Sequence, residues 1–191
     1  MTIMQSIHDQ EVKVRYHVAK LALFNVRFIH RLQNDPNTQS IIEDEAKKNG
    51  MENPPSLLNQ STFLQFSYIC LVWLWEAAKN AKLGDDLLKE FSKSANLRSL
   101  TLPDKAQIKG EREIKTWKDV IRLLRNALAH GNIKTYEDSF RFSDINRHNN
   151  AEKDFTTLTL SWKDLAIISE TVIHCLTPLI YPSSQHSGRK D

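Results

Sequence analysis

Hydrophobic residues recur along most of the chain at the three- and four-residue spacing of helices that bury one face. The first such pattern predicts a long helix over residues 11–32, with apolar positions at Val14, Val18, Leu21, Ala22, Phe24, Val26 and Phe28. Residues 61–82 are apolar on nearly every side, as in a helix that is buried on most of its surface. Residues 39–49 and 85–95 predict two shorter helices. Gly50 and Gly84 each follow a helical pattern, as Gly131 does further along the chain, and glycine commonly ends a helix.

Two further long helices are marked by polar residues that can cap their first turns. Thr116 with Asp119 begins a helix that runs to His130, and Ser161 with Asp164 begins a last helix that continues until Pro178. Between them, apolar and polar residues alternate around Phe140 and again before position 160, which predicts a small antiparallel hairpin within residues 138–160.

These elements predict an all-α protein, an up-and-down four-helix bundle with extra short helices and a small β-hairpin between the third and fourth long helices. We expect one domain over residues 1–181 and a disordered polar tail over residues 182–191. Residues 97–110 predict a loop, and a loop of that length often lies near a site or an interface.

Composition indicates in which compartment the protein functions, but it does not identify a binding partner. The 191 residues carry a net charge of +3, which tolerates an anionic partner but does not require one. Cys70 and Cys175 lie in apolar helical stretches and are interpreted as core thiols in a reducing compartment. The chain shows neither a leader nor an apolar run long enough to span a bilayer, so we expect a cytoplasmic protein with no membrane partner.

The signatures of metal and nucleotide chemistry are missing from the sequence. It contains neither a zinc-binding His-Glu-x-x-His helix nor a paired Cys-x-x-Cys, and it has no glycine-rich phosphate loop. We therefore expect no metal and no cofactor. The other histidines and the four tryptophans are interpreted as packing or surface residues, although tryptophan is able to stack on bases.

One stretch, residues 124–132, carries the chemistry that could act on RNA. Arg125 is able to hold a phosphate through two parallel hydrogen bonds, and His130 can exchange a proton near neutral pH. Asn126 and His130 share one stripe of the predicted helix, so Asn126 is placed to orient the imidazole. Arg125 lies roughly 140° around and roughly 7.5 Å along the helix from His130, so either the reach of its side chain or a second copy of the chain must bring the two together, and the spacing favours a dimeric site.

The same residues also fit an ordinary helix end, because basic side chains in a last turn followed by glycine are common there. Lys118 and Arg122 lie on the same polar face, and they are either RNA contacts or solvated charge.

Arg125, Asn126 and His130 within Leu-Arg-Asn-Ala-Leu-Ala-His-Gly-Asn resemble the motif of the HEPN family, an arginine followed by a polar residue and then a histidine near the end of the third helix. The resemblance is specific over the helix that carries the motif. The remaining helices match the family only in their pattern of apolar and polar residues. It implies a homodimeric, metal-independent endoribonuclease, a toxin or phage-defence protein, with a nucleotidyltransferase-type antitoxin as a possible partner. It further implies that Arg125 and His130 are catalytic and that Asn126 supports them.

Three functions follow from the sequence. The first is a HEPN endoribonuclease whose site combines residues of two subunits and whose products end in a 2′,3′-cyclic phosphate. The second is a HEPN module that dimerises and binds RNA or a protein partner without cutting. The third is an antitoxin or immunity-type partner.

Overall fold

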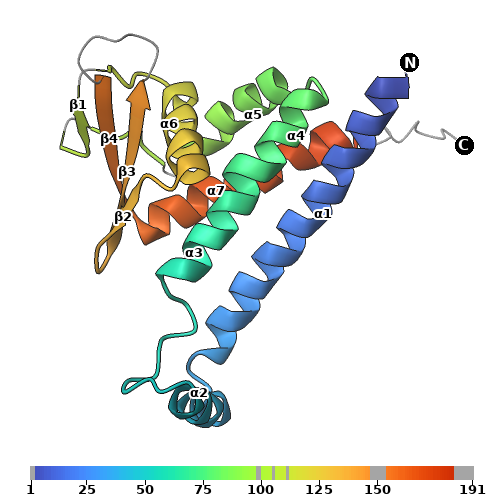
Figure 1. Cartoon of the computed structure of the whole chain (residues 1–191). Helices are drawn as coiled ribbons and strands as arrows, with labels where there is room; N and C mark the ends of the chain where they lie inside the picture. The colour runs from blue at the N-terminus through green and yellow to red at the C-terminus, as the bar shows by residue number, and fades with distance from the viewer. Residues whose placement is uncertain (1–2, 98–99, 105, 111, 147–153, 183–191) are drawn as a thin grey trace, which may run out of the picture.

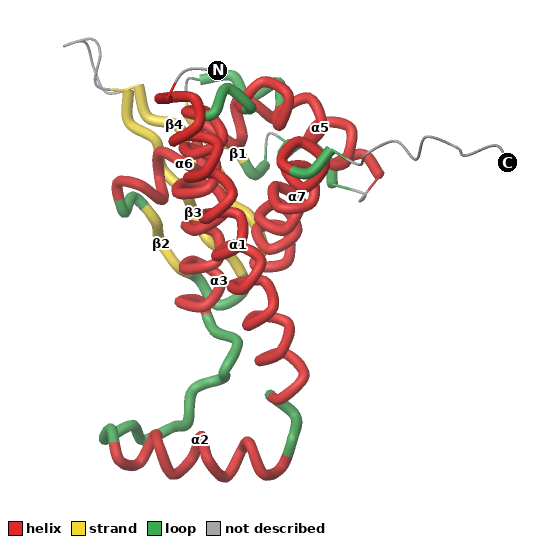
Figure 2. Tube along the Cα trace, turned by 90° about the vertical axis from the view of Figure 1, so that its right-hand side faces the viewer, coloured by secondary structure: helices red, strands yellow, loops and turns green. Residues whose placement is uncertain are grey.

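The computed structural model describes residues 3–97, 100–104, 106–110, 112–146 and 154–182. In chain order its elements are α1 (Ile3–Leu32), α2 (Pro36–Lys48), α3 (Gln60–Ser67), η1 (Tyr68–Leu74), α4 (Trp75–Asn80), α5 (Gly84–Leu97), β1 (Ile108–Gly110), α6 (Trp117–His130), β2 (Ile133–Thr135), β3 (Ser139–Asn146), β4 (Asp154–Ser161) and α7 (Trp162–Ile180). Figure 1 shows the sheet at one side, α6 against it, α3, η1 and α4 in front of α7, and α1 at the opposite side. Helix α2 projects away from this body at the far end of α1 (Figure 2).

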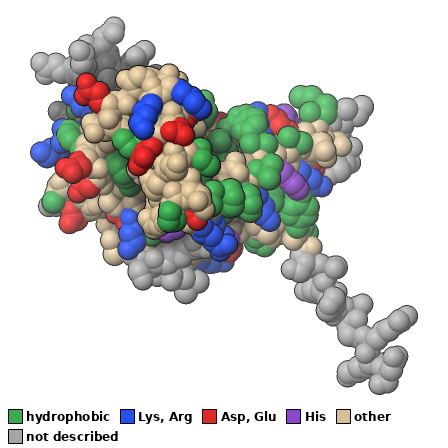
Figure 3. All heavy atoms as spheres, turned by 90° about the horizontal axis from the view of Figure 1, so that it is seen from below, with side chains coloured by type: hydrophobic (Ala, Val, Ile, Leu, Met, Phe, Trp, Pro, Cys, Tyr) green, Lys and Arg blue, Asp and Glu red, His purple; other side chains and the backbone are tan. Residues whose placement is uncertain are grey.

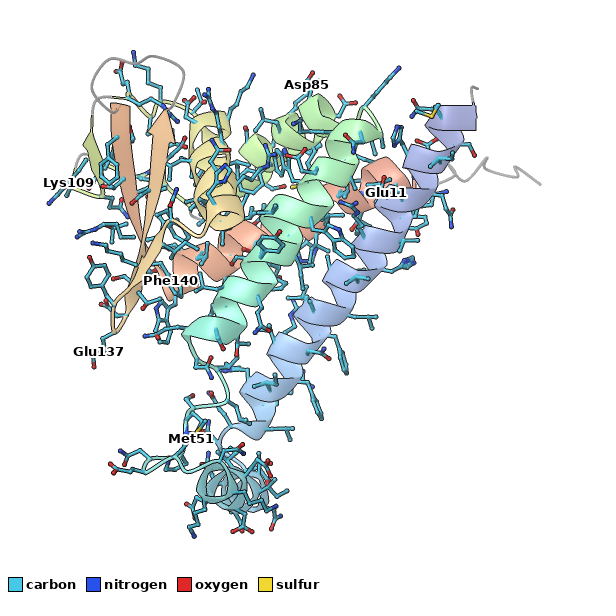
Figure 4. The ribbon with its side chains drawn as sticks, in the orientation of Figure 1. Glu11, Met51, Asp85, Lys109, Glu137 and Phe140 are labelled. Atoms are coloured by element: carbon cyan, nitrogen blue, oxygen red, sulfur yellow. The ribbon has the colours of Figure 1, made fainter. Side chains whose placement is uncertain are left out.

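The four strands form one antiparallel sheet in the order β1-β4-β3-β2. Strands β3 and β4 pair along their whole length, with Phe140 opposite Leu160 and Phe142 opposite Leu158. These four side chains are buried and belong to the same hydrophobic core as the inner face of α6. Phe140, labelled in Figure 4, stacks on Trp162 at the start of α7 with 5.9 Å between ring centroids. The sheet therefore forms one wall against which the helix of residues 117–130 packs.

The predicted hairpin within residues 138–160 is confirmed and the chain is mostly helical as predicted, but its sheet is larger than an all-α protein with one hairpin would have. The loop expected over residues 97–110 ends in β1, and β2 follows α6 directly, so the hairpin becomes a four-stranded sheet. Each added strand has only three residues, too few to show an alternation of apolar and polar positions. β1 pairs with β4, a strand distant in sequence, whereas β2 forms a tight turn with the next strand, β3. The helical character holds, while a simple up-and-down four-helix bundle is not confirmed.

Two of the predicted helices are present but differ from the prediction, one in its internal geometry and one in its last residue. The expected helix 61–82 consists of α3, η1 and α4, where η1 is a seven-residue π-helix. The last helix continues through Pro178 to the buried Ile180, so its predicted end at Pro178 is wrong. Proline in a final turn removes one hydrogen bond, and the apolar contacts of the residues beyond it offset that loss. Most of the predicted tail, from residue 183 on, lies outside the described residues.

Both cysteines are buried free thiols, as predicted, and burial, followed by the charge of Glu170, raises the pKa of the Cys70 thiol. Among the described helices, none combines the length and the apolar character that a membrane span requires.

The N-terminus of α6 is fixed by a capping box. The side chain of Thr116 accepts a hydrogen bond from the backbone N–H of Asp119 at 3.4 Å, and the Asp119 carboxylate accepts one from the N–H of Thr116 at 2.9 Å. Burial raises the pKa of Asp119, but hydrogen bonds from the Thr116 side chain and from the backbone of Lys115 and Thr116 outweigh it, and the pKa is lowered.

We expect Thr116→Ala to lower the free energy of unfolding by about 1 kcal/mol at neutral pH, because the helix loses its cap. Because the folded-state pKa of Asp119 is lowered, its stabilising contribution is present above the unfolded-state pKa and is lost as the pH falls through the folded-state pKa. Thr116→Ala removes one of the hydrogen bonds that lower this pKa, so the stability difference from the native chain should shrink on acidification. Urea unfolding at neutral and acidic pH measures both effects, and a difference that grows on acidification would contradict them.

Candidate active site on helix α6

Helix α6 is the scaffold of the candidate site. Its apolar side, which includes Val120, Leu124 and Ala127, is fully buried in the core, so the polar side chains have fixed directions. The helix ends at Gly131, whose φ of 69° is left-handed and therefore favours glycine. The backbone N–H of Asn132 donates to the carbonyl of Ala127 at 2.9 Å, and the N–H of Ser143 in β3 donates to the carbonyl of Asn132 at 2.9 Å. The motif end of α6 is thus attached to the sheet.

Arg125 lies between α6 and α4, where it forms an ion pair with Glu76. Its side chain is only 17 % exposed, and its Nε has no hydrogen-bond acceptor among the described residues. Burial lowers the pKa of the guanidinium, although arginine stays charged at any ordinary pH. Glu76 also pairs with Lys79 at 3.3 Å, so one carboxylate holds two cations. Arg125 is therefore a fixed cation with part of its hydrogen-bonding capacity unused.

Asn126 points to a different neighbour, the sheet. Its side-chain amide donates to Oδ2 of Asp144 in β3 at 3.1 Å, and Arg112 donates to the same oxygen at 2.7 Å. Asp144 is buried, with 6 % of its surface exposed, and these two donors supply the hydrogen bonds that a buried carboxylate needs. Asn126 links the motif helix to β3.

His130 is the last residue of α6 and is exposed. Among the described residues, its ring makes no hydrogen bond, and neither a hydrogen bond nor an ion pair joins His130 to Arg125 or Asn126. Within one chain, the arginine and the asparagine of the motif thus have separate partners on α4 and β3, and the histidine faces solvent. The predicted role of Asn126 in orienting the imidazole stays a prediction.

The two other candidate residues, Lys118 and Arg122, are exposed on the same side of α6 as Arg125. With Arg125 they line one cavity between α6 and the corner of α4 and α5. The structure therefore brings three of the five predicted site residues together.

Sequence reasoning missed Glu76 and Asp144, although each left a signal. Asp144 continues the alternation of Phe140 and Phe142, so it falls on the buried face of its strand, where a carboxylate needs a partner. Glu76 is the single charged residue in the apolar run of residues 69–78, a position that acids rarely occupy without a counter-charge. Each position indicates that the carboxylate has a polar or positively charged partner, but the sequence does not identify that partner.

A comparison with protein families agrees with the motif. A family model described as HEPN pEK499 p136 matches residues 4–179, almost the whole chain. No curated protein and no solved structure shows a significant match.

Proposed function

Because the chain belongs to the HEPN family, we propose that it is a metal-independent endoribonuclease whose catalytic residues are Arg125 and His130, with Asn126 in support. One observation carries the proposal. The arginine of the motif is a fixed cation that lines a cavity, while the histidine on the same helix is exposed and can reach a substrate.

The reaction requires only proton transfer and charge stabilisation. A histidine takes the proton of a ribose 2′-hydroxyl, and the 2′-oxygen forms a bond to the adjacent phosphorus. The bond from phosphorus to the 5′-oxygen breaks, and that oxygen receives a proton from a second acid. Arg125 stabilises the negative charge that grows on the phosphoryl oxygens. The products are a 2′,3′-cyclic phosphate and a free 5′-hydroxyl, and DNA cannot react because it lacks the attacking group.

The separation of Arg125 from His130 supports a site built from two copies of the chain, in which base, acid and cations come from different subunits. Exposed apolar residues on α1, which lies on the side of the molecule opposite the sheet and α6, offer a separate surface through which two copies could associate. Ile7, Val14, Leu21 and Phe28 are spaced by seven residues and are between 50 % and 63 % exposed, while another side of α1 is buried in the core. A seven-residue spacing keeps these side chains on one stripe roughly 31 Å long, as in helices that pair. Figure 3 shows hydrophobic side chains gathered on that side of the molecule.

We expect Leu21→Glu to convert a dimer into a monomer, because it places a charge in the apolar stripe. Lys20→Glu, which changes the neighbouring exposed residue, is the control and should stay dimeric. Light scattering after size-exclusion chromatography measures both masses. A native chain that is monomeric at high concentration would overturn the proposed dimer.

In the cell, we propose that the protein acts as a toxin in a toxin-antitoxin or phage-defence system, with a nucleotidyltransferase-type antitoxin as a possible partner. Expression should arrest growth, and His130→Ala should restore it. A protein encoded by the neighbouring reading frame should relieve the arrest if it is the antitoxin.

The ion pair of Arg125 with Glu76 favours a second candidate, a HEPN module that dimerises and binds RNA or a partner without cutting. A carboxylate that already neutralises the arginine competes with a phosphate for it. The two candidates differ in a direct assay, since the nuclease cleaves single-stranded or structured RNA in the presence of EDTA. Harmless expression together with intact RNA in that assay would support the binding module and contradict the nuclease.

A further inference from the structure

A cavity of about 290 Å³ lies between α6 and the corner where α4 leads into α5. Four cations line it, Lys79, Lys118, Arg122 and Arg125, together with Asp85 at the start of α5, which is labelled in Figure 4. Three of the cations lie on α6 at steps of four and three residues, which makes a row about 10 Å long on one side of the helix. The lining of the cavity thus has an excess of positive charge.

Much of that charge is available to a ligand. Glu76 pairs with Lys79 and Arg125 and partly neutralises both. Lys118 and Arg122 are exposed and form no ion pair with a described residue. An anion in the cavity would gain hydrogen bonds to charged donors, which are stronger than those to neutral ones.

The remaining lining is mainly apolar. Trp75, Leu88 and Ile121 form part of the wall, and Trp75 and Ile121 belong to the hydrophobic core, so this surface is held rigidly. An apolar wall with a few charged groups is the usual form of a small-ligand site, and the volume lies just below the range of about 300–1,000 Å³ for such sites. It suits a single base better than a longer segment.

We propose that this cavity is a nucleotide subsite, which takes the RNA nucleotide next to the scissile phosphate. The inference rests on the proposed function, because Arg125 belongs both to the motif and to the cavity. The row of cations on α6 binds successive phosphates, and the apolar wall at Leu88 receives a base. A site for inorganic phosphate alone or for an acidic peptide would leave that wall unused.

The test measures binding of a 2′-O-methyl oligonucleotide, which lacks the attacking hydroxyl, by fluorescence anisotropy over a range of salt concentrations. Lys118→Ala and Arg122→Ala should each weaken binding and reduce the salt dependence by about 0.7 in the slope of log K against log salt. Lys163→Ala, the removal of an exposed lysine on α7, is the matched control and should leave both quantities unchanged. Binding by the two α6 variants that equals that of the native chain would overturn the subsite.

An abasic oligonucleotide of equal length and charge tests the place of the base. It should bind about fivefold more weakly or worse, because base stacking on a protein surface is lost. Leu88→Ser should weaken the intact oligonucleotide and leave the abasic one unchanged, and Leu102→Ser, at an exposed leucine away from the cavity, should change neither. Equal affinity for the two oligonucleotides would overturn the base-binding wall.

These binding measurements do not depend on whether the protein cleaves RNA, since the 2′-O-methyl analogue cannot be cut. Binding that depends on Lys118 and Arg122 without any cleavage of natural RNA would support the subsite and overturn the nuclease. Cleavage of natural RNA, together with native binding by the Lys118 and Arg122 variants, would support the nuclease and overturn the subsite.

Discussion

Alanine in place of His130 is expected to lower the rate of RNA cleavage by about 10²- to 10⁴-fold, the usual contribution of a general acid or base. The loss should be in catalysis and not in folding, because His130 is exposed and makes no hydrogen bond with a described residue. Thermal unfolding should therefore give the same midpoint for the variant and the native chain. His30→Ala, at an exposed histidine of α1, is the matched control and should cleave at the native rate.

Substitutions of Arg125 test whether this arginine, like His130, takes part in catalysis. Arg125→Ala should reduce cleavage by a similar factor, and Arg125→Lys should recover only part of it, because lysine cannot donate two parallel hydrogen bonds to a phosphate. Arg27→Ala removes an exposed arginine that also pairs with a glutamate, Glu170, and should leave the rate unchanged. Full activity in both His130→Ala and Arg125→Ala would exclude these residues from catalysis.

The second large effect concerns stability. Asp144→Ala should lower the free energy of unfolding by about 3 kcal/mol, because it leaves the charge of Arg112, which is 17 % exposed, and the amide of Asn126 without their acceptor. In a protein of this size the melting temperature should fall by roughly 6–12 °C. Asp138→Ala, at an exposed position just before β3, is the control and should shift it little.

A double variant separates the lost pair from a general effect of the substitution. Replacing the pair together, as Arg112→Met with Asp144→Leu, should be less destabilising than Asp144→Ala, because no buried charge is left unpaired. A double variant that is less stable than Asp144→Ala would show that the ion pair is not the cause. Because Asn126 is bonded to Asp144, RNA cleavage by Asp144→Ala should also fall at temperatures where the variant is still folded.

The sequence predicted the motif helix well, because every signal for it is local. Thr116 and Asp119 begin α6, Gly131 ends it, and the apolar positions between them fall on one buried side. The hairpin around Phe140 was also predictable, from strict alternation on one strand. Elements that are short or depend on distant partners were not. β1 pairs with a distant strand and has only three residues. β2 has a neighbouring partner but is equally short, and the π-helix η1 lies within an apolar run that looks like any buried helix.

In the candidate site, too, the sequence predicted the local features but not the partners that come from other elements. Residue types and spacing pointed to Arg125, Asn126 and His130, and the angle between them predicted that Arg125 faces away from His130. They could not identify Glu76 as the partner of Arg125 or Asp144 as the partner of Asn126, since each pair joins elements far apart in sequence. Those partners explain why the arginine and the asparagine are held in place within one chain.

The most direct test of the nuclease is an analysis of the ends of RNA incubated with the purified chain in EDTA. We expect cleavage to fragments with 2′,3′-cyclic phosphate and 5′-hydroxyl ends, and no cleavage of a substrate whose ribose at the cleavage site is replaced by 2′-deoxyribose. Intact RNA, or fragments with 5′-phosphate ends that form only when a divalent metal is added, would contradict it.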